Sequence, residues 1–171
     1  MKKREFLKKS ALMASTVAFL PSCVSNVATE SSKRLRTAHI GVGTQGAEDL
    51  GAIASHNAVD VVAICDVDAN NLAAAQKLYP NAKVYADYRT MFEEMSNDID
   101  AVVVSTPDHT HAPASMLAME KNKPVYCQKP LTHHVSEARA MRKMAEEKNL
   151  VTQMGIQVHS FYDYKLATLL I

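Results

Sequence analysis

The sequence predicts an α/β fold built on a doubly wound parallel sheet. From residue 35 onward, short apolar runs alternate with longer stretches of helical periodicity, a pattern typical of a parallel sheet that helices cover on both faces. The run at residues 101–104 is apolar throughout, as expected for a strand buried on both sides. A glycine-rich turn at residues 41–46 joins the first expected strand to the first expected helix. This context selects the dinucleotide-binding (Rossmann) arrangement, with strand order 3-2-1-4-5-6.

Each element follows from a local pattern, taken in chain order. The first strand is apolar and ends in glycines, and the helix after it places Ala47, Leu50 and Ile53 on one face. Pro80 stops the second helix, and Pro113 is tolerated in the first turn of the fourth. Strands are therefore expected at residues 37–42, 60–65, 83–85, 101–105, 124–127 and 150–154, and helices at residues 45–55, 69–78, 88–95, 112–121 and 135–148.

The apolar stripes also predict which side chains face the sheet. The second helix is expected to turn Ala75 and Leu78 inward, and the fifth helix to do the same with Val135. Cys65 and Cys127 stand at the ends of expected strands, without a second cysteine at zinc or redox spacing. We expect both thiols to be small buried apolar groups.

An export signal is expected over residues 1–23. Residues 1–23 contain five basic residues and one acidic residue. The apolar stretch that follows the basic residues is too short to span a bilayer as a helix. Lys3-Arg4-Glu5-Phe6-Leu7-Lys8 resembles the twin-arginine motif, with Lys in place of the first Arg, and Leu20-Pro21-Ser22-Cys23 resembles a bacterial lipobox that would make Cys23 a lipid anchor. We expect an exported bacterial protein, periplasmic or membrane-anchored. The alternative is an amphipathic or frayed helix on a cytosolic protein.

The rest of the chain divides into three segments. Residues 24–34 are small and polar and are expected to be a linker. Residues 35–155 form the NAD(P)-binding domain, and residues 156–171 are expected to begin a truncated second domain, because the pattern changes there and ends on an apolar run. Beyond residue 23 the chain carries 14 basic and 17 acidic residues. This mildly acidic balance indicates no nucleic-acid partner.

The turn Gly41-Val42-Gly43-Thr44-Gln45-Gly46 matches the dinucleotide fingerprint. Gly41 allows the tight turn, Gly43 lets the backbone approach a pyrophosphate, and Gly46 lets the helix pack close to the sheet. The helix then starts at Thr44 and Gln45, where free N–H groups and the positive end of the helix dipole favour phosphate. The alternative is a turn with a purely structural role.

Asp66 ends the second expected strand, 20 residues after Gly46. A carboxylate at that place accepts hydrogen bonds from the adenosine ribose hydroxyls and repels a 2′-phosphate. No Arg or Lys follows at residues 67–70. The cofactor is therefore expected to be NAD, with NADP less favoured.

Two further loops follow expected strands at the same edge of the sheet. Thr106, Pro107 and His109 follow the fourth strand, beside the topological switch point, and are expected at the cofactor. The histidines of this loop lack a carboxylate partner at metal spacing, so no metal site is expected. Lys129 follows the fifth strand, where a lysine could bind a substrate hydroxyl or assist proton transfer. The alternative is a solvated lysine.

Taken together and in this order, the glycine turn, Asp66, Ser105-Thr106-Pro107-Asp108-His109-Thr110-His111 and Gln128-Lys129-Pro130-Leu131-Thr132 resemble the Gfo/Idh/MocA oxidoreductases. The resemblance implies a Rossmann domain that holds NAD(P), followed by a second α/β domain that binds substrate and helps form homo-oligomers. It implies hydride transfer to or from a sugar or polyol. It also places Lys129 at the substrate as the catalytic residue, with His111 and Gln157 beside the pocket.

One departure from the family leaves other functions open. The family's Glu-Lys-Pro motif has Gln128 at its first position here, so the charge of the glutamate is missing. The family's Asp/His acid–base pair belongs to the second domain, outside this sequence. An NAD-dependent glycosidase of the same family is one alternative, and a non-catalytic nucleotide- or sugar-binding module is the other.

Overall fold

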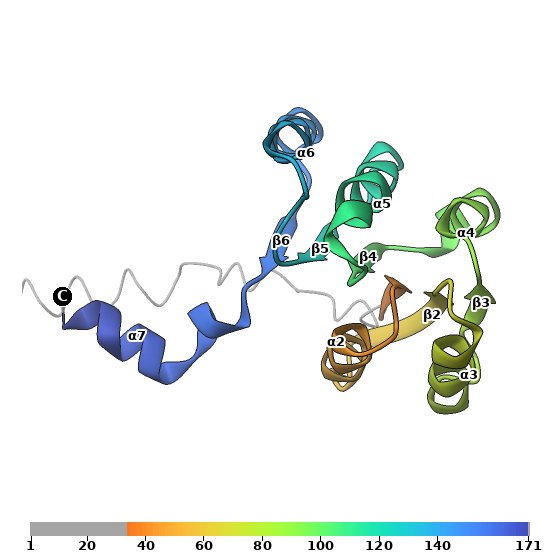
Figure 1. Cartoon of the computed structure of the whole chain (residues 1–171). Coiled ribbons are helices and arrows are strands. Elements are labelled where there is room, and N and C mark those ends of the chain that lie inside the picture. The colour runs from red at the N-terminus through yellow and green to blue at the C-terminus, as the bar shows by residue number, and fades with distance from the viewer. Residues whose placement is uncertain (1–33, 171) are drawn as a thin grey trace, which may run out of the picture. The chain divides into compact units, whose positions relative to one another are not determined.

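The computed structural model describes residues 34–170, and within them a six-stranded, fully parallel sheet carries the fold. The strands lie in the order β3-β2-β1-β4-β5-β6. Helices α2 and α3 lie on one face of the sheet, and α4, α5 and α6 lie on the other (Figure 1). The predicted fold class and strand order are confirmed.

The elements alternate along the chain as expected, and most bounds agree with the predicted ones to within two residues. Within the described residues, no helix has the length and apolar character needed to cross a membrane. The predicted export signal, the lipidation at Cys23 and nearly all of the linker fall outside the described residues. The strands are β1 Leu35–Ile40, β2 Val59–Cys65, β3 Lys83–Tyr85, β4 Ala101–Val104, β5 Val125–Gln128 and β6 Thr152–Gly155; the helices are α2 Gln45–Ala54, α3 Ala69–Leu78, α4 Tyr88–Met95, α5 Asp108–Glu120, α6 Val135–Lys148 and α7 Tyr162–Leu169, with short 3-10 turns at Ser96–Asp98 and Gln157–Ser160.

Helix α5 starts four residues earlier than predicted, at Asp108. Pro107 is its N-cap residue with φ −58°, and the Thr110 amide donates to the Pro107 carbonyl at 2.9 Å. Proline is well suited to this place because its fixed φ is compatible with the helix start. Pro113 then lies in the second turn, on the exposed side of the helix. His109 and His111 consequently belong to the first turn of a helix and not to a loop.

The core has one part on each face of the sheet. The larger part packs Met91, Phe92 and Met119 from α4 and α5 against Val102 of β4. The smaller part lies under α2 and α3 and includes Leu50, Ile64 and Ala75. Burying a large apolar side chain contributes roughly 1.5–3 kcal/mol, so the larger part carries most of the apolar stabilisation.

Three side chains differ from the predicted helix faces. Leu78 and Val135 are 74% and 70% exposed, and they are the last residue of α3 and the first residue of α6. On α2, Ala47 is exposed while Asp49 is buried at 8% exposure. One of the buried positions on this helix, beside Leu50, is therefore occupied by a carboxylate.

The prediction for the two strand-end cysteines is confirmed. Cys65 and Cys127 are 2% and 1% exposed, and both are free thiols. Burial raises the pKa of Cys65 to about 12 and that of Cys127 to about 11. Since the thiolate is the reactive form, both side chains act as apolar core groups.

His39 makes the stability of the domain depend on pH. It lies in β1 at 1% exposure, with Nε2 3.1 Å from Thr37 Oγ1, and burial lowers its pKa to about 4. Between pH 6.5 and 4 the unfolded chain binds a proton at this residue and the folded chain does not. We therefore expect His39 to lower the free energy of unfolding by up to about 1.4 kcal/mol per pH unit as the pH falls through this range.

The measurement is urea unfolding of the wild-type chain and of His39→Leu at pH 7, 6 and 5. The variant keeps a buried apolar side chain but removes the titrating group, so its stability should fall less steeply with acid. Parallel pH dependences of the two proteins would contradict a buried neutral His39.

Candidate functional site

The carboxyl ends of β1, β2 and β4 surround a cavity of about 640 Å³. β1 is the switch point of the sheet, because the chain runs outward from it to β2 and β3 on one side and to β4, β5 and β6 on the other. Ligands of open α/β sheets bind in the crevice at that point. Eight of the predicted cofactor residues line this cavity: Gly41, Gly43, Thr44, Gln45, Asp66, Thr106, Pro107 and His109.

The glycine turn is shaped by close backbone approaches. Gly41 has φ +83°, and a Cβ on it would lie 2.6 Å from the Ser105 carbonyl oxygen. A Cβ on Gly46 would lie 2.2 Å from the Gly41 carbonyl oxygen. Neither site has room for a side chain, so helix α2 starts directly against the turn and the end of β4.

The start of α2 is arranged for an anion. Its N-cap residue Thr44 has φ 43° and makes no side-chain capping bond to the helix. A left-handed backbone at a non-glycine residue costs energy, and such strain is often found at functional sites. The amides of Gly46 and Ala47 donate to the Gly43 and Thr44 carbonyls at 2.8 and 3.1 Å. Gln45, the first residue of the helix, lines the cavity, so the positive end of the helix dipole lies beside it.

Asp66 ties the glycine turn to the turn that follows β2. Its Oδ2 accepts from the Val42 amide at 2.9 Å, and its Oδ1 accepts from the Asp68 amide at 2.9 Å. An ionised carboxylate has about four acceptor positions, so Asp66 retains capacity for a ribose hydroxyl. Asp68 also lines the cavity. Two carboxylates at this end disfavour a 2′-phosphate.

Asn71 was not predicted and lies over the glycine turn. Its side-chain amide is 3.4 Å from Asp66 Oδ2, and a Cβ on Gly43 would lie 2.3 Å from its nitrogen. The sequence has only an ordinary helix position there, and no local signal indicates that the side chain reaches back across the turn. The absence of a side chain on Gly43 thus leaves room for Asn71.

A buried polar cluster joins α2, β4 and β5 beneath the cavity. The Asp49 carboxylate accepts from Ser105 Oγ at 2.7 Å and from Gln128 Nε2 at 2.9 and 3.1 Å, while Gln45 Nε2 donates to it at 3.2 Å. Gln128 is only 4% exposed. Asp49 was missed because the periodicity of α2 places it beside an apolar stripe, where an acid is normally exposed.

Lys129 leaves the end of β5 with its side chain exposed, beyond the lining of the cavity. Its backbone amide donates to Gln128 Oε1 at 3.1 Å, and the peptide bond to Pro130 is cis. Gln157 is half-buried at the start of the short turn after β6, two residues past Gly155, which pairs with Gln128 in the sheet. Both therefore lie at the same edge of the sheet as the cavity.

His111 is not placed as expected for a substrate contact. It is 1% exposed, and its Nδ1 and Nε2 each lie 2.7 Å from a backbone carbonyl, that of Pro130 and that of Thr106. The ring therefore joins the loop after β4 to the loop after β5. This role depends on two loops meeting, and the spacing of histidines in the sequence carries no sign of it.

Asp108, in the first turn of α5, is flanked by two exposed histidines. His133 Nδ1 is 3.3 Å from Asp108 Oδ2, and His109 Nδ1 is 3.9 Å from the other oxygen. The hydrogen bond with His133 lowers the pKa of the Asp108 carboxyl. Within residues 34–170, no three His, Cys, Asp or Glu side chains come together as metal ligands.

The residues around the first cavity fit a dinucleotide. The turn has no Cβ at the three glycines, and the helix start supplies donors for phosphate. Thr106 Oγ1 is buried beside the cavity without a hydrogen-bond partner among the described residues. Buried polar atoms normally have partners, so this hydroxyl is consistent with a ligand or a water there.

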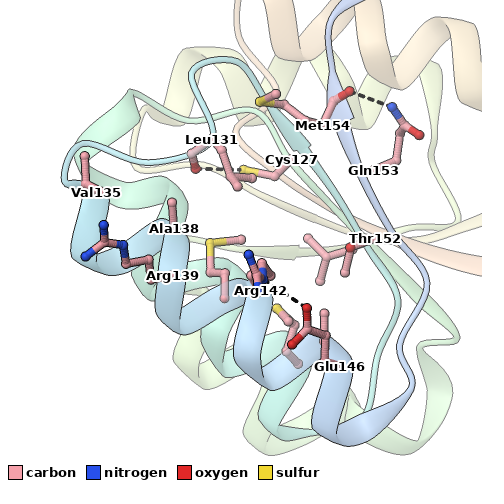
Figure 2. A pocket seen from close by; sticks show the side chains of 14 residues that line it. Cys127, Leu131, Val135, Ala138, Arg139, Arg142, Glu146, Thr152, Gln153 and Met154 are labelled. Carbon is pink, nitrogen blue, oxygen red and sulfur yellow. Dashed lines mark hydrogen bonds and ion pairs between the residues drawn. The ribbon is translucent and has the colours of Figure 1, made fainter.

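A second cavity of about 590 Å³ lies between α6 and the strands β5 and β6 (Figure 2). Apolar side chains such as Met119, Val125 and Met141 form most of its wall, and the ion pair of Arg142 and Glu146, at 2.9 Å, stands at its margin. None of the glycines of the turn at residues 41–46 lines this second cavity. The candidate site is therefore the cavity at the switch point.

Comparison with known proteins agrees with this assignment. Residues 35–156 match the family described as "Oxidoreductase family, NAD-binding Rossmann fold". The chain is 32% identical over 131 residues to the inositol 2-dehydrogenase of Salmonella typhimurium, covering 75% of this chain and 38% of that protein. It is 30% identical over 139 residues to a glycosyl hydrolase family 109 protein of Stenotrophomonas maltophilia, covering 75% of this chain and 29% of that protein. The crystal structure of myo-inositol 2-dehydrogenase from Lactobacillus plantarum superposes with a TM-score of 0.74 at 28% identity, over 81% of this chain and 41% of that one.

Proposed function

Because the chain belongs to the Gfo/Idh/MocA oxidoreductases, the family with an NAD-binding Rossmann fold, we propose that it provides the cofactor-binding part of an NAD-dependent oxidoreductase acting on a sugar or polyol. The chain spans 38% of the length of the inositol 2-dehydrogenase relative. The observation that carries the proposal is the glycine turn held by Asp66 at the mouth of the switch-point cavity.

The residues of this chain divide the work between binding and chemistry. The turn at residues 41–46 and the start of α2 bind the pyrophosphate, and Asp66 binds the adenosine ribose. Thr106, Pro107 and His109 border the other end of the cavity. The bound cofactor supplies the hydride acceptor or donor. Lys129, at the end of β5, holds the reacting hydroxyl of the substrate and assists the movement of its proton.

Calorimetric titration of the full chain with NAD, and separately with NADP, tests the cofactor site. We expect NAD to bind more tightly than NADP. Asp66→Ala removes a charged acceptor and loosens Val42, and hydrogen bonds to charged groups are worth about 1.5–3 kcal/mol. NAD affinity should therefore fall roughly 10- to 100-fold.

Asp60→Ala is the matched control, since Asp60 lies near the start of β2, whereas Asp66 directly follows the end of that strand, and Asp60 pairs with Arg34 at 3.1 Å. Its NAD affinity should equal that of the wild-type chain. Failure of the wild-type chain to bind either nucleotide would overturn the proposed function.

A glycosidase is the second candidate, favoured by the 30% identity to the glycosyl hydrolase family 109 protein. Such an enzyme would oxidise its sugar only transiently and would regenerate its NAD within each turnover. Release of the aglycone from an aryl glycoside without accumulation of NADH would favour it. Steady NADH formation with a free polyol would favour the dehydrogenase.

Two further parts of the proposal rest on the N-terminal segment and on the family resemblance. The basic start and lipobox-like sequence of residues 1–23 favour export and a lipid anchor at Cys23. The family resemblance favours a homo-oligomer. Radiolabelled palmitate would be incorporated into the wild-type protein and not into Cys23→Ser if the anchor forms.

A further inference from the structure

We propose that Asp49 and Gln128 are a matched pair of positioning residues that hold Lys129 in register with the helix of the glycine turn. The inference rests on the proposed function, because it concerns the placement of Lys129 relative to the cofactor site. Neither residue lines the cavity, and both act through the groups that they fix.

The first observation is the location of the pair. Asp49 is on α2, one turn after the glycine turn, and Gln128 is the last residue of β5, directly before Lys129. The two are 79 positions apart in the sequence and are joined by contacts of 2.9 and 3.1 Å from Gln128 Nε2 to the two carboxylate oxygens. Ser105, the residue directly after β4, donates to the same carboxylate at 2.7 Å and adds a third segment to the cluster.

The second observation is that Gln128 uses both ends of its amide. The nitrogen donates to Asp49, and Oε1 accepts from the Lys129 backbone amide at 3.1 Å. A neutral amide is the group that can donate on one side and accept on the other. The Gln128 side chain also packs closely on the backbone of Gly155. A Cβ on Gly155 would lie 3.0 Å from Cδ and Nε2 of Gln128. The side chain therefore links the carboxylate on α2 to the backbone of Lys129.

The third observation concerns charge. Asp49 and Gln128 are 8% and 4% exposed, so the pair buries a single negative charge that is satisfied by hydrogen bonds. A glutamate at position 128, the residue expected from the family's motif, would bring two carboxylates into contact in a poorly solvated place. Like charges so placed repel strongly. Glutamine at position 128 is thus explained by aspartate at position 49.

The test is Gln128→Glu in the whole enzyme of which this chain is the cofactor-binding part, measured with NAD and a polyol that the wild-type enzyme oxidises. Repulsion from Asp49 should displace the end of β5, and kcat should fall at least about tenfold because Lys129 moves from its substrate. Asp66 and the glycine packing are untouched, so the Kd for NAD should stay within about threefold of wild type. A purely structural pair would change the melting temperature and leave kcat of the folded protein unaltered.

The exchanged pair Asp49→Asn/Gln128→Glu supplies the rescue. It restores one carboxylate and one amide with their places reversed, so kcat should recover to within about threefold of wild type. Gln153→Glu is the control for the same chemical change, since Gln153 is exposed on the neighbouring strand β6. It should leave kcat unchanged.

The outcomes separate the two proposals. A wild-type chain that binds no NAD would overturn the proposed function. A wild-type chain that binds NAD and turns over, together with a folded Gln128→Glu protein of unaltered kcat, would overturn the positioning pair. So would an exchanged pair that folds and binds NAD but fails to recover kcat.

Discussion

Gly46→Ala should destabilise the domain and weaken NAD binding by about tenfold or more. The new Cβ would lie 2.2 Å from the Gly41 carbonyl oxygen and 3.3 Å from Ser105 Cβ. A backbone oxygen cannot rotate away, so α2 has to shift from the turn that it starts. Overpacking of this kind costs about 1–3 kcal/mol of stability. The same shift moves the start of α2 away from the phosphates, so NAD affinity should fall as well. A tenfold loss of affinity corresponds to about 1.4 kcal/mol of binding free energy.

Gly51→Ala is the control on the same helix. Nothing lies within 4 Å of the position its Cβ would take, and alanine is a better helix former than glycine by about 0.5–1 kcal/mol. This variant should therefore be slightly more stable than wild type and should bind NAD normally. Chemical unfolding and calorimetric titration of both variants provide the measurements. Equal behaviour of Gly46→Ala and Gly51→Ala would refute the steric account of the turn.

Lys129→Met should lower kcat by about 10²- to 10⁴-fold, the range typical of a lost acid–base group. Methionine keeps the length and the apolar stem of the side chain but removes the ammonium group. The Kd for NAD should stay near that of wild type, because Lys129 lies outside the lining of the cavity. Steady-state kinetics on a polyol substrate, with NAD titration in parallel, separate the two effects.

Lys121→Met makes the same chemical change at an exposed residue that follows α5. Its kcat should equal that of wild type. If Lys129→Met turned over as fast as Lys121→Met, Lys129 would be a solvated surface lysine, the alternative that the sequence leaves open.

Gly46, Lys129 and the buried pair Asp49 and Gln128 lie in one region of the molecule. The glycine turn places the cofactor, and the end of β5 places Lys129. Hydrogen bonds from Gln128 to Asp49, and from the Lys129 amide to Gln128, connect helix α2 with the end of β5. Damage to the turn should therefore appear mainly in NAD affinity, and damage to the pair or to Lys129 mainly in kcat.

Prediction from sequence worked best where a local pattern decides the structure. Helix α3 and helix α6 have the predicted bounds, because caps and apolar spacing act within a few residues. The start of α5 was placed too late, since Pro113 was assigned to the first turn and Asp108 was not considered as a helix start. Leu78 and Val135 were expected inward but are exposed, because periodicity does not say how well the end of a helix is covered by its neighbours.

The sequence by itself determined the α/β class, the glycine turn and the acid that follows β2, since each depends on residues close together in the chain. It also indicated the strand order, through the dinucleotide-binding arrangement that the glycine turn selects. Only the tertiary structure decided that Asp49 is buried against Gln128, that Asn71 covers Gly43, and that His111 joins two loops. The contact between Asp49 and Gln128 spans 79 positions. Such a contact exists only after α2, β4 and β5 have packed, and a polar side chain at a helix position gives no local sign of the partner that packing will bring to it.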